Sequence, residues 1–156
     1  MYQPMRRKKY EKTEQDGWSY LDRAEWGVLS LCADGLPYGV PLNHARVGST
    51  LYFHCALEGQ KLEFLKANPV AMFTAVASAK VLRARGSTAY ECAMAFGKVR
   101  VVTDEAERLA GFHAINGRFT ESKELGLSFI DKWGKDALVL AMDVERVTAK
   151  SIPEGV

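Results

Sequence analysis

The sequence predicts a mainly β protein: one domain, residues 1–156, built as a small antiparallel barrel with peripheral helices. Its length of 156 residues suits a single domain with its own core. Short strand-like segments follow one another, and only turns separate the first three. Parallel βαβ winding is therefore excluded, because parallel strands need a crossover, usually a helix, between them.

Composition and charge exclude several other classes. Hydrophobic residues make up 47% and charged residues 26%, which is ordinary for a globular protein. A net charge of +2 is too small to predict nucleic acid as a partner, and no apolar run could span a membrane. The basic N-terminus MYQPMRRKKYEK lacks the apolar stretch of a secretory signal. The sequence thus predicts a cytoplasmic protein.

Cysteine usage agrees with that location. The chain has 3 cysteines, Cys32, Cys55 and Cys92, an odd number at wide spacings without a CxxC pair. This pattern predicts neither a disulfide framework nor a metal site. Reduced thiols are expected.

The N-terminal half is predicted to contain an arm, a short helix and three strands. Residues 1–15 should form a mobile arm, whose basic run Arg6–Lys9 is either a solvated tail or a cover for an anionic ligand. A helix is expected over 19–26, starting near Asp16 or Ser19. Strands are expected over residues 27–33, 38–47 and 51–55. The turn signals Asp34-Gly35 and Gly48-Ser49 separate them.

The C-terminal half is predicted to alternate helices with longer strands. A helix over 59–67 should end at Asn68-Pro69, because proline disfavours helical geometry in the residue before it. Asp104 and Glu107 have capping-box spacing at the start of a helix over 104–116, and Gly117 is its stop signal. Further predicted elements are strands 70–76, 80–85, 89–102 (with a bend or bulge at Gly97) and 137–148, and a helix over 121–133.

A phosphate site is one interpretation of LYFHCALEGQKLEFLKANP, residues 51–69. A strand ends near His54, and a helix begins near Gly59 with Lys61 in its first turn. Free backbone N–H groups and the helix dipole favour an anion there, and glycine permits close approach. A structural histidine and a surface lysine are the alternatives. Neither GxxxxGK[ST] nor GxGxxG is present.

A planar ligand is one interpretation of YGVPLNHA, residues 38–45. Pro41 lies inside a strand pattern, although proline cannot donate a hydrogen bond to a neighbouring strand. Asn43 shares a face with Pro41 and could bond a ring carbonyl or imide. An edge strand with a polar rim is the alternative explanation.

No other constellation predicts catalysis. Ser30 and Ser49 have no His and Asp partners at diagnostic positions. His44 should point to the face opposite Asn43 and receives no role, and His113 is expected at a surface or packed position. The catalytic residues therefore stay unknown.

Four stretches of the sequence resemble the FMN-binding split-barrel family. They are MRRK near the N-terminus, GLPYGVPLN followed by LYFHCALEGQKLEFLKANP, and the block AYECAMAFGKVRVVTDEAER. The sequence is most similar to the nitroimidazole reductase (Nim) branch, which is related to pyridoxamine 5′-phosphate oxidase. The resemblance runs from about Met5 to Lys150.

The resemblance implies an antiparallel split β-barrel that forms a homodimer with FMN between the subunits. The long apolar segment 89–102 also favours a partner surface. The implied cofactor contacts are Val40, Pro41, Leu42 and Asn43 at the flavin ring, His54, Cys55 and Lys61 at the phosphate, and Tyr90 and Glu91 contributed by the second subunit. Two departures from the family pattern are Cys55, where Gly, Ser or Ala is more usual, and Cys92, where a hydroxyl is more usual.

The implied function is an FMN-dependent oxidoreductase that reduces a small electrophile such as a nitroaromatic. Asn43 or a nearby arginine could stabilise the reduced flavin. NAD(P)H, if it is the donor, would bind transiently, because no nicotinamide fingerprint is present. The alternatives are a non-catalytic flavin- or haem-binding protein and an activity like that of pyridoxamine 5′-phosphate oxidase. The tail DVERVTAKSIPEGV lacks the arginine and histidine expected for the oxidase.

Overall fold

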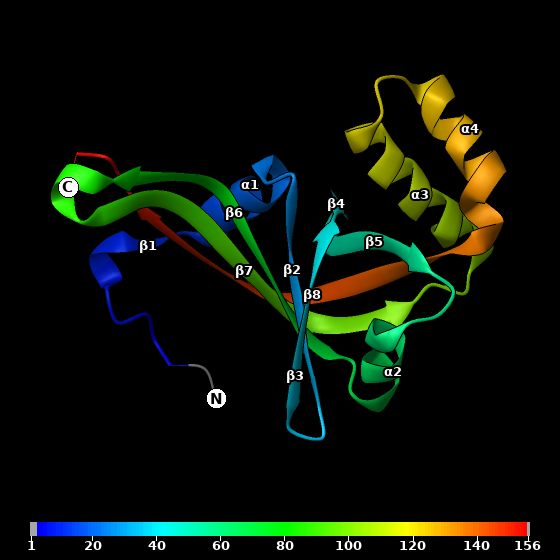
Figure 1. The fold of residues 1–156 in the computed structure, drawn as a ribbon, viewed down its shortest axis with the longest axis horizontal. Helices are drawn as coiled ribbons and strands as arrows, with labels where there is room; N and C mark the ends of the chain where they lie inside the picture. Colours follow the sequence, from blue (N-terminus) through cyan, green and yellow to red (C-terminus); the bar gives the residue numbers. More distant parts are fainter. Residues whose placement is uncertain (1–2, 156) are drawn as a thin grey trace.

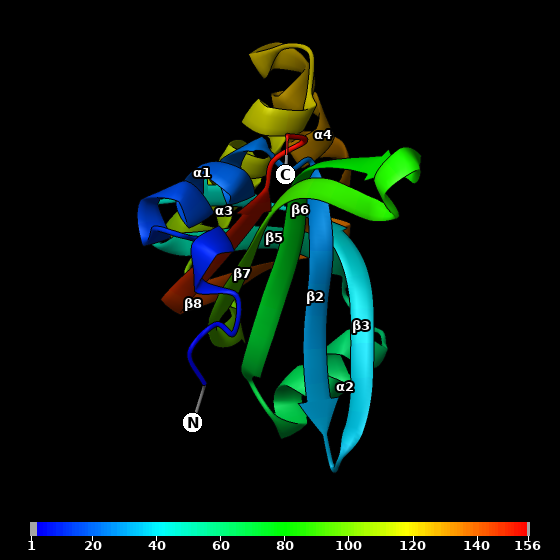
Figure 2. The same ribbon diagram turned by 90° about the vertical axis from the view of Figure 1, so that its left-hand side faces the viewer.

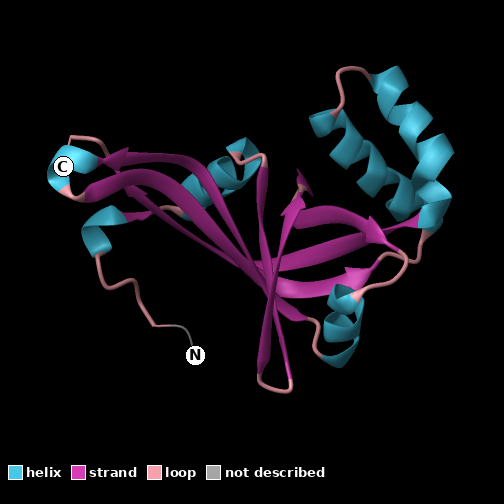
Figure 3. Cartoon of the chain, in the orientation of Figure 1, coloured by secondary structure: helices cyan, strands magenta, loops and turns pink. Residues whose placement is uncertain are grey.

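A computed structural model describes residues 3–155, and its centre is one antiparallel sheet that curls into an incomplete barrel (Figures 1 and 3). The strands are β1 (Glu11–Lys12), β2 (Trp26–Ala33), β3 (Leu36–Asn43), β4 (Ala45–Val47), β5 (Thr50–Ala56), β6 (Val70–Leu82), β7 (Ser87–Val101) and β8 (Ala137–Ile152). The main strand order is β3-β2-β6-β7-β8-β5-β4, and β1 pairs with β8. The predicted fold class is confirmed.

Within the described residues, four α-helices pack around the sheet. They are α1 (Glu14–Arg23), α2 (Gln60–Ala67), α3 (Glu105–Phe119) and α4 (Lys123–Trp133). Helix α1 contacts β6, β7 and β8, while α2 lies against the β2–β3 hairpin (Figure 2). Helices α3 and α4 pack on each other over β5, at the end of the molecule away from the chain termini (Figure 1).

The core lies inside the curled sheet. Leu29, Phe53, Phe73 and Met142 project inward from four different strands and are fully buried. Leu29 and Phe73 alternate with more exposed neighbours, the period-two pattern of strands that are packed on one face. Phe53 and Met142 lie in continuous buried runs, because β5 and β8 are covered on both faces. A second buried cluster, which includes Tyr52 and Ile115, joins α3 to the outer face of the sheet.

The predicted strand 38–47 is wrong as a single element. The chain leaves β3 after Asn43 and re-enters the sheet as β4, which pairs with β5 instead of β2. His44 occupies the corner and is fully buried, with Nε2 2.8 Å from the carbonyl oxygen of Leu21. Its ring centroid lies 4.7 Å from that of Phe73. Burial of one polar side chain thus divides an otherwise regular strand pattern.

His44 should make stability depend on pH. Burial is the main cause that lowers the pKa of His44 from 6.5 to about 4. Across that window the unfolded chain binds a proton that the folded chain excludes, so stability falls as the pH falls. The expected loss is up to ~1.4 kcal/mol per pH unit. Urea unfolding of His44→Gln and the parent protein across this window should show a shallower slope for the variant, and parallel slopes would contradict this account.

The start of the first helix differs from the prediction. Helix α1 begins at Glu14, because Thr13 forms a capping box with Asp16. The Thr13 hydroxyl accepts from the Asp16 N–H at 3.1 Å, and Asp16 accepts from the Thr13 N–H at 3.0 Å. Within the predicted arm 1–15, Glu11–Lys12 pairs with β8 and the helix begins at Glu14. The mobility of the arm stays a prediction. The predicted arm residues 1 and 2 lie outside the described residues.

Two later elements, α3 and β6, end at other residues than the sequence predicted. The Asp104 cap is confirmed, since its side chain accepts from the Glu107 N–H at 2.8 Å. Helix α3 continues past Gly117 to Phe119, however. The separate strand over 80–85 is also wrong, because β6 runs to Leu82 through an irregularity near Val76, and Arg83–Arg85 forms a 3-10 turn. Within residues 3–155 no helix is long and apolar enough to cross a bilayer.

Candidate functional site

The edge strand β3 has one face toward the core and one toward the exterior. Tyr38, Val40 and Leu42 are half-buried and pack against the core, while Pro41 and Asn43 are exposed. Pro41 and Asn43 therefore share the outer face, as predicted. Because β3 ends the strand order, an edge position tolerates the missing N–H of Pro41. Because the side chains of Val40 and Leu42 point toward the core, only their backbone atoms can face a ligand on the outer side of β3.

Asn43 is held in place at the end of β3. Its Nδ2 donates to the carbonyl oxygen of Glu25 at 2.9 Å. Arg118, from α3, donates to the carbonyl oxygen of His44 at 3.1 Å and of Asp22 at 2.7 Å. These bonds tie the β3–β4 corner to the end of α1, and they leave Oδ1 of Asn43 as an acceptor for a ligand.

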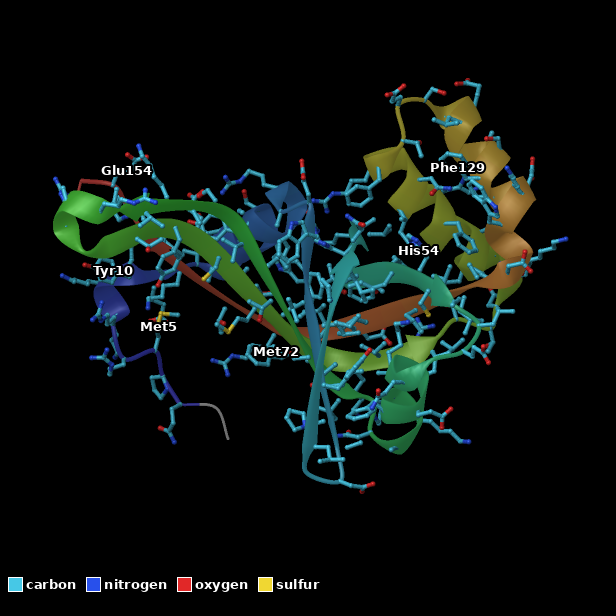
Figure 4. The ribbon with its side chains drawn as sticks, in the orientation of Figure 1. Met5, Tyr10, His54, Met72, Phe129 and Glu154 are labelled. Atoms are coloured by element: carbon cyan, nitrogen blue, oxygen red, sulfur yellow. The ribbon has the colours of Figure 1, made fainter. Side chains whose placement is uncertain are left out.

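A cavity of about 290 Å³ lies beside Asn43, between the α3–α4 pair and the sheet. Its walls are Asn43, His54, Phe112, Ile115, Asn116, Phe119, Thr120, Phe129, Ile130, Trp133, Gly134 and Ala137. Figure 4 shows His54 on β5 just below α3 and α4, on the same side of the molecule as Phe129. His54 is exposed to solvent, but partial desolvation beside the helix pair lowers its pKa, which favours its neutral form. The structure thus brings Asn43 and His54, both predicted ligand contacts, to one cavity.

The loop between β5 and α2 provides a separate, cationic position. Gly59 precedes α2 with φ 132°, and no side chain caps the helix. The Lys61 ammonium lies 4.0 Å from where a Cβ on Gly59 would be. The first-turn N–H groups of a helix have no intrahelical partner, so this geometry fits a phosphate. The glycine also leaves room for close approach.

Cys55 and His54 project to opposite faces of β5. The Cys55 side chain is buried in the barrel core, and burial raises the pKa of its thiol, with the Lys61 charge opposing the shift. Its predicted neighbour Lys61 is therefore nearby, while the imidazole of His54 faces the α3–α4 cavity. Three residues were predicted to contact the phosphate, and Lys61 is the one whose side chain is best placed to do so.

Tyr90 and Glu91 also lie on opposite faces of their strand, β7. Glu91 accepts from Arg23 at 2.9 Å and from Ser78 at 3.1 Å. Tyr90 lines an apolar hollow of about 420 Å³ on the long β6–β7–β8 arm, together with Val76 and Met94. Within one chain, these two residues do not line the cavity that contains Asn43.

Sequence reasoning missed the role of the α3–α4 pair. It predicted two peripheral helices without a site, although Phe129 and Trp133 recur at i, i+4 and lie on one helix face. Their ring centroids are 4.9 Å apart. The signal was present as that spacing, but the same spacing is usual for core packing.

Solved structures share this fold. A protein assigned to 5-nitroimidazole antibiotic resistance from Bacteroides thetaiotaomicron is 25% identical, with a TM-score of 0.71 over 89% of this chain and 84% of that one. An FAD- and haem-binding protein from Mycobacterium smegmatis is 24% identical, with a TM-score of 0.72 over 95% and 72% of the two chains. An FAD-binding protein from Mesorhizobium loti is 20% identical, with a TM-score of 0.65 over 89% and 93%.

Sequence comparison gives the family. No curated protein matches the chain significantly. The profile described as pyridoxamine 5′-phosphate oxidase matches residues 13–151, which includes both the β3–α2 region and the β7 block. This match and the structural neighbours confirm the resemblance that the motifs predicted. The chain belongs to the pyridoxamine 5′-phosphate oxidase family.

Proposed function

We propose that this protein is a flavin-dependent oxidoreductase that uses FMN and reduces a small electrophile. One observation carries the proposal: Asn43 belongs both to the outer face of β3 and to the wall of the cavity between the sheet and the α3–α4 pair. A flavin ring lying along β3 would therefore border a space in which a small molecule fits. The nitroimidazole-resistance and FAD-binding structural neighbours support the same assignment.

The residues present fit FMN at both of its ends. Lys61 and the uncapped N-terminus of α2 would hold the phosphate. Pro41 and Asn43 would contact the ring, which would take the edge of β3 that no neighbouring strand pairs with. When bound, a flavin supplies hydride or electron transfer, and the protein supplies orientation and electrostatics. The neutral imidazole of His54 offers one donor or acceptor to a molecule in the adjacent cavity.

A homodimer would complete the site. Val76 is 52% exposed and Met94 is 37% exposed on the β6–β7–β8 arm, around an apolar hollow. Exposed apolar patches of this kind mark interaction surfaces. Tyr90, which lines the same hollow, would then reach the flavin of the second subunit.

Light scattering tests this assembly. A dimeric mass is expected at micromolar concentration, and Val76→Asp should shift the population toward monomer, because a buried unpaired carboxylate at the interface is costly. Val70→Asp is the matched control, since Val70 is 50% exposed on the same strand and does not line the hollow. A monomeric mass for the parent protein would contradict the proposed dimer.

Pro41→Ala and Asn43→Ala should change the flavin environment more than its affinity. Each substitution alters the outer face of β3 and leaves the Lys61 position intact. The expected result is a shifted flavin absorption band or reduction potential, with FMN affinity changed by less than about tenfold. Unchanged spectra and potentials for both variants would show that the ring does not contact β3.

Turnover tests the oxidoreductase assignment itself. The flavin-loaded protein should oxidise NAD(P)H when nitrobenzene is supplied as the acceptor. A protein that binds flavin, but whose flavin neither NADH nor NADPH reduces, would favour the second candidate: a non-catalytic flavin- or haem-binding protein. The FAD- and haem-binding neighbour and the neutral His54 imidazole are the observations behind that alternative.

A further inference from the structure

The α3–α4 cavity has walls of a distinctive chemistry. Four aromatic side chains and two isoleucines line it: Phe112, Phe119, Phe129, Trp133, Ile115 and Ile130. Among the described residues around it, none is Lys, Arg, Asp or Glu. An ion entering this space would lose hydration without gaining an opposite charge, and that loss is costly.

Two of the polar wall residues already make hydrogen bonds within the α3–α4 pair. The Asn116 Nδ2 donates to the carbonyl oxygen of Gly126 at 2.9 Å, and the Thr120 hydroxyl donates to the carbonyl oxygen of Asn116 at 2.7 Å. The other two, Asn43 and His54, come from the sheet. The Asn43 Nδ2 also has a partner, the carbonyl oxygen of Glu25, so the sheet side offers a ligand the Asn43 Oδ1 and the imidazole of His54.

The mouth of the cavity is aromatic as well. Trp133 is 49% exposed and Phe119 is 38% exposed, although both rings border the cavity. Phe129 packs against Trp133 with centroids 4.9 Å apart and a tilt of 36°. Flat ligands gain from offset or tilted contact with such rings, and a bound ring would cover apolar surface that is now exposed to water.

The volume limits the ligand. About 290 Å³ is at the small end of the roughly 300–1,000 Å³ usual for sites that hold drug-sized molecules. An aromatic molecule of one or two rings fits this space.

We propose that the α3–α4 cavity is a binding site for a small, uncharged aromatic molecule, held by the aromatic walls and oriented by Asn43 and His54. Its role as the acceptor site rests on the proposed flavin function. Binding itself does not, because all the walls belong to this chain. The helix pair would then determine which acceptors reach the flavin.

Equilibrium binding to the flavin-free protein tests the proposal with three probes. Nitrobenzene is neutral with one ring, 4-nitrobenzoate is charged with one ring, and 1-nitronaphthalene is neutral with two rings. Isothermal titration calorimetry gives each dissociation constant. Nitrobenzene and 1-nitronaphthalene should each bind at least about tenfold more tightly than 4-nitrobenzoate. Equal or tighter binding of 4-nitrobenzoate would overturn the proposed preference for uncharged ligands.

Two variants place the probe in the cavity. Ile130→Phe fills it and should weaken nitrobenzene about tenfold or more. Trp133→Ala opens the mouth and should improve the affinity for 1-nitronaphthalene relative to nitrobenzene, with calorimetry as the readout. Leu125→Ala is the matched control, because Leu125 is an exposed apolar residue of α4 outside the cavity wall. Thermal melts confirm folding, and wild-type affinities in both cavity variants would overturn the assignment.

FMN titration of the same preparations separates this proposal from the function proposed above. FMN binding without nitrobenzene binding would overturn only the cavity assignment. Nitrobenzene binding that obeys the variant pattern, without FMN binding, would support the cavity and overturn the flavin function.

Discussion

Lys61→Ala should weaken FMN binding about ten- to hundredfold and change riboflavin binding little. The loss corresponds to one charge-assisted contact, roughly 1.5–3 kcal/mol. The reason is positional: the Lys61 ammonium lies over Gly59 at the uncapped start of α2, where a phosphate would also meet the first-turn N–H groups. Riboflavin has no phosphate, so it cannot lose this contact.

Lys66→Ala is the matched control for that experiment. Lys66 is exposed in the last turn of the same helix and contributes the same overall charge. Flavin fluorescence quenching gives both affinities for each variant. Equal weakening of FMN and riboflavin by Lys61→Ala, or equal weakening of FMN by both lysine substitutions, would place the phosphate elsewhere.

Gly97→Ala should lower the free energy of unfolding by about 3 kcal/mol or more, the upper end for overpacking. A Cβ at this position would lie 2.0 Å from the Asp143 carbonyl oxygen and 3.1 Å from the Cα of Val144. Both contacts are backbone atoms of β8, beside the register shift after Phe96. The added methyl group can only be accommodated by separating β7 from β8.

Gly117→Ala also adds one methyl group, but this substitution should raise the free energy of unfolding. Gly117 lies inside α3, and nothing would lie within 4 Å of a Cβ there. Replacing an exposed helical glycine by alanine should stabilise the protein by roughly 0.5–1 kcal/mol. Urea unfolding at a fixed protein concentration measures both variants. Equal stabilities for the two variants would contradict the packing explanation.

These glycines illustrate what local pattern can predict. Gly97 was predicted to mark a bend or bulge because it interrupts a long apolar segment. The register between β7 and β8 does shift beside it, although the extra residue, Glu145, lies on β8. Gly117 was predicted to stop a helix, yet α3 continues to Phe119. The difference is tertiary: packing of α3 on α4 and on the sheet outweighs the weak cost of one exposed glycine.

The strand break at His44 could not be predicted from the local sequence either, because it also depends on tertiary contacts. Residues 38–47 alternate as one strand would, and nothing local indicates that β3 and β4 pair with different neighbours. The break depends on contacts that are distant in sequence, with Leu21, Phe73 and Arg118 around the imidazole and backbone of His44. Such contacts are invisible in a single sequence.

The candidate site was predictable in part. Period-two alternation placed Pro41 and Asn43 on one face, and the glycine and lysine pattern indicated the start of α2. Alternation also implied that His54 and Cys55 diverge, although the family resemblance grouped both at the phosphate. The cavity itself needed the packing of α3 and α4 over β5, which no motif encodes.

The central claim is that this chain binds a flavin through β3 and the start of α2. Its most direct test is a visible absorption spectrum of the purified protein, repeated during titration with FMN and with gel filtration to remove free cofactor. Oxidised flavin bands that stay with the protein, perturbed relative to free FMN, are the predicted result. A protein that retains no flavin after titration, or that shows only the spectrum of a haem, would contradict the claim.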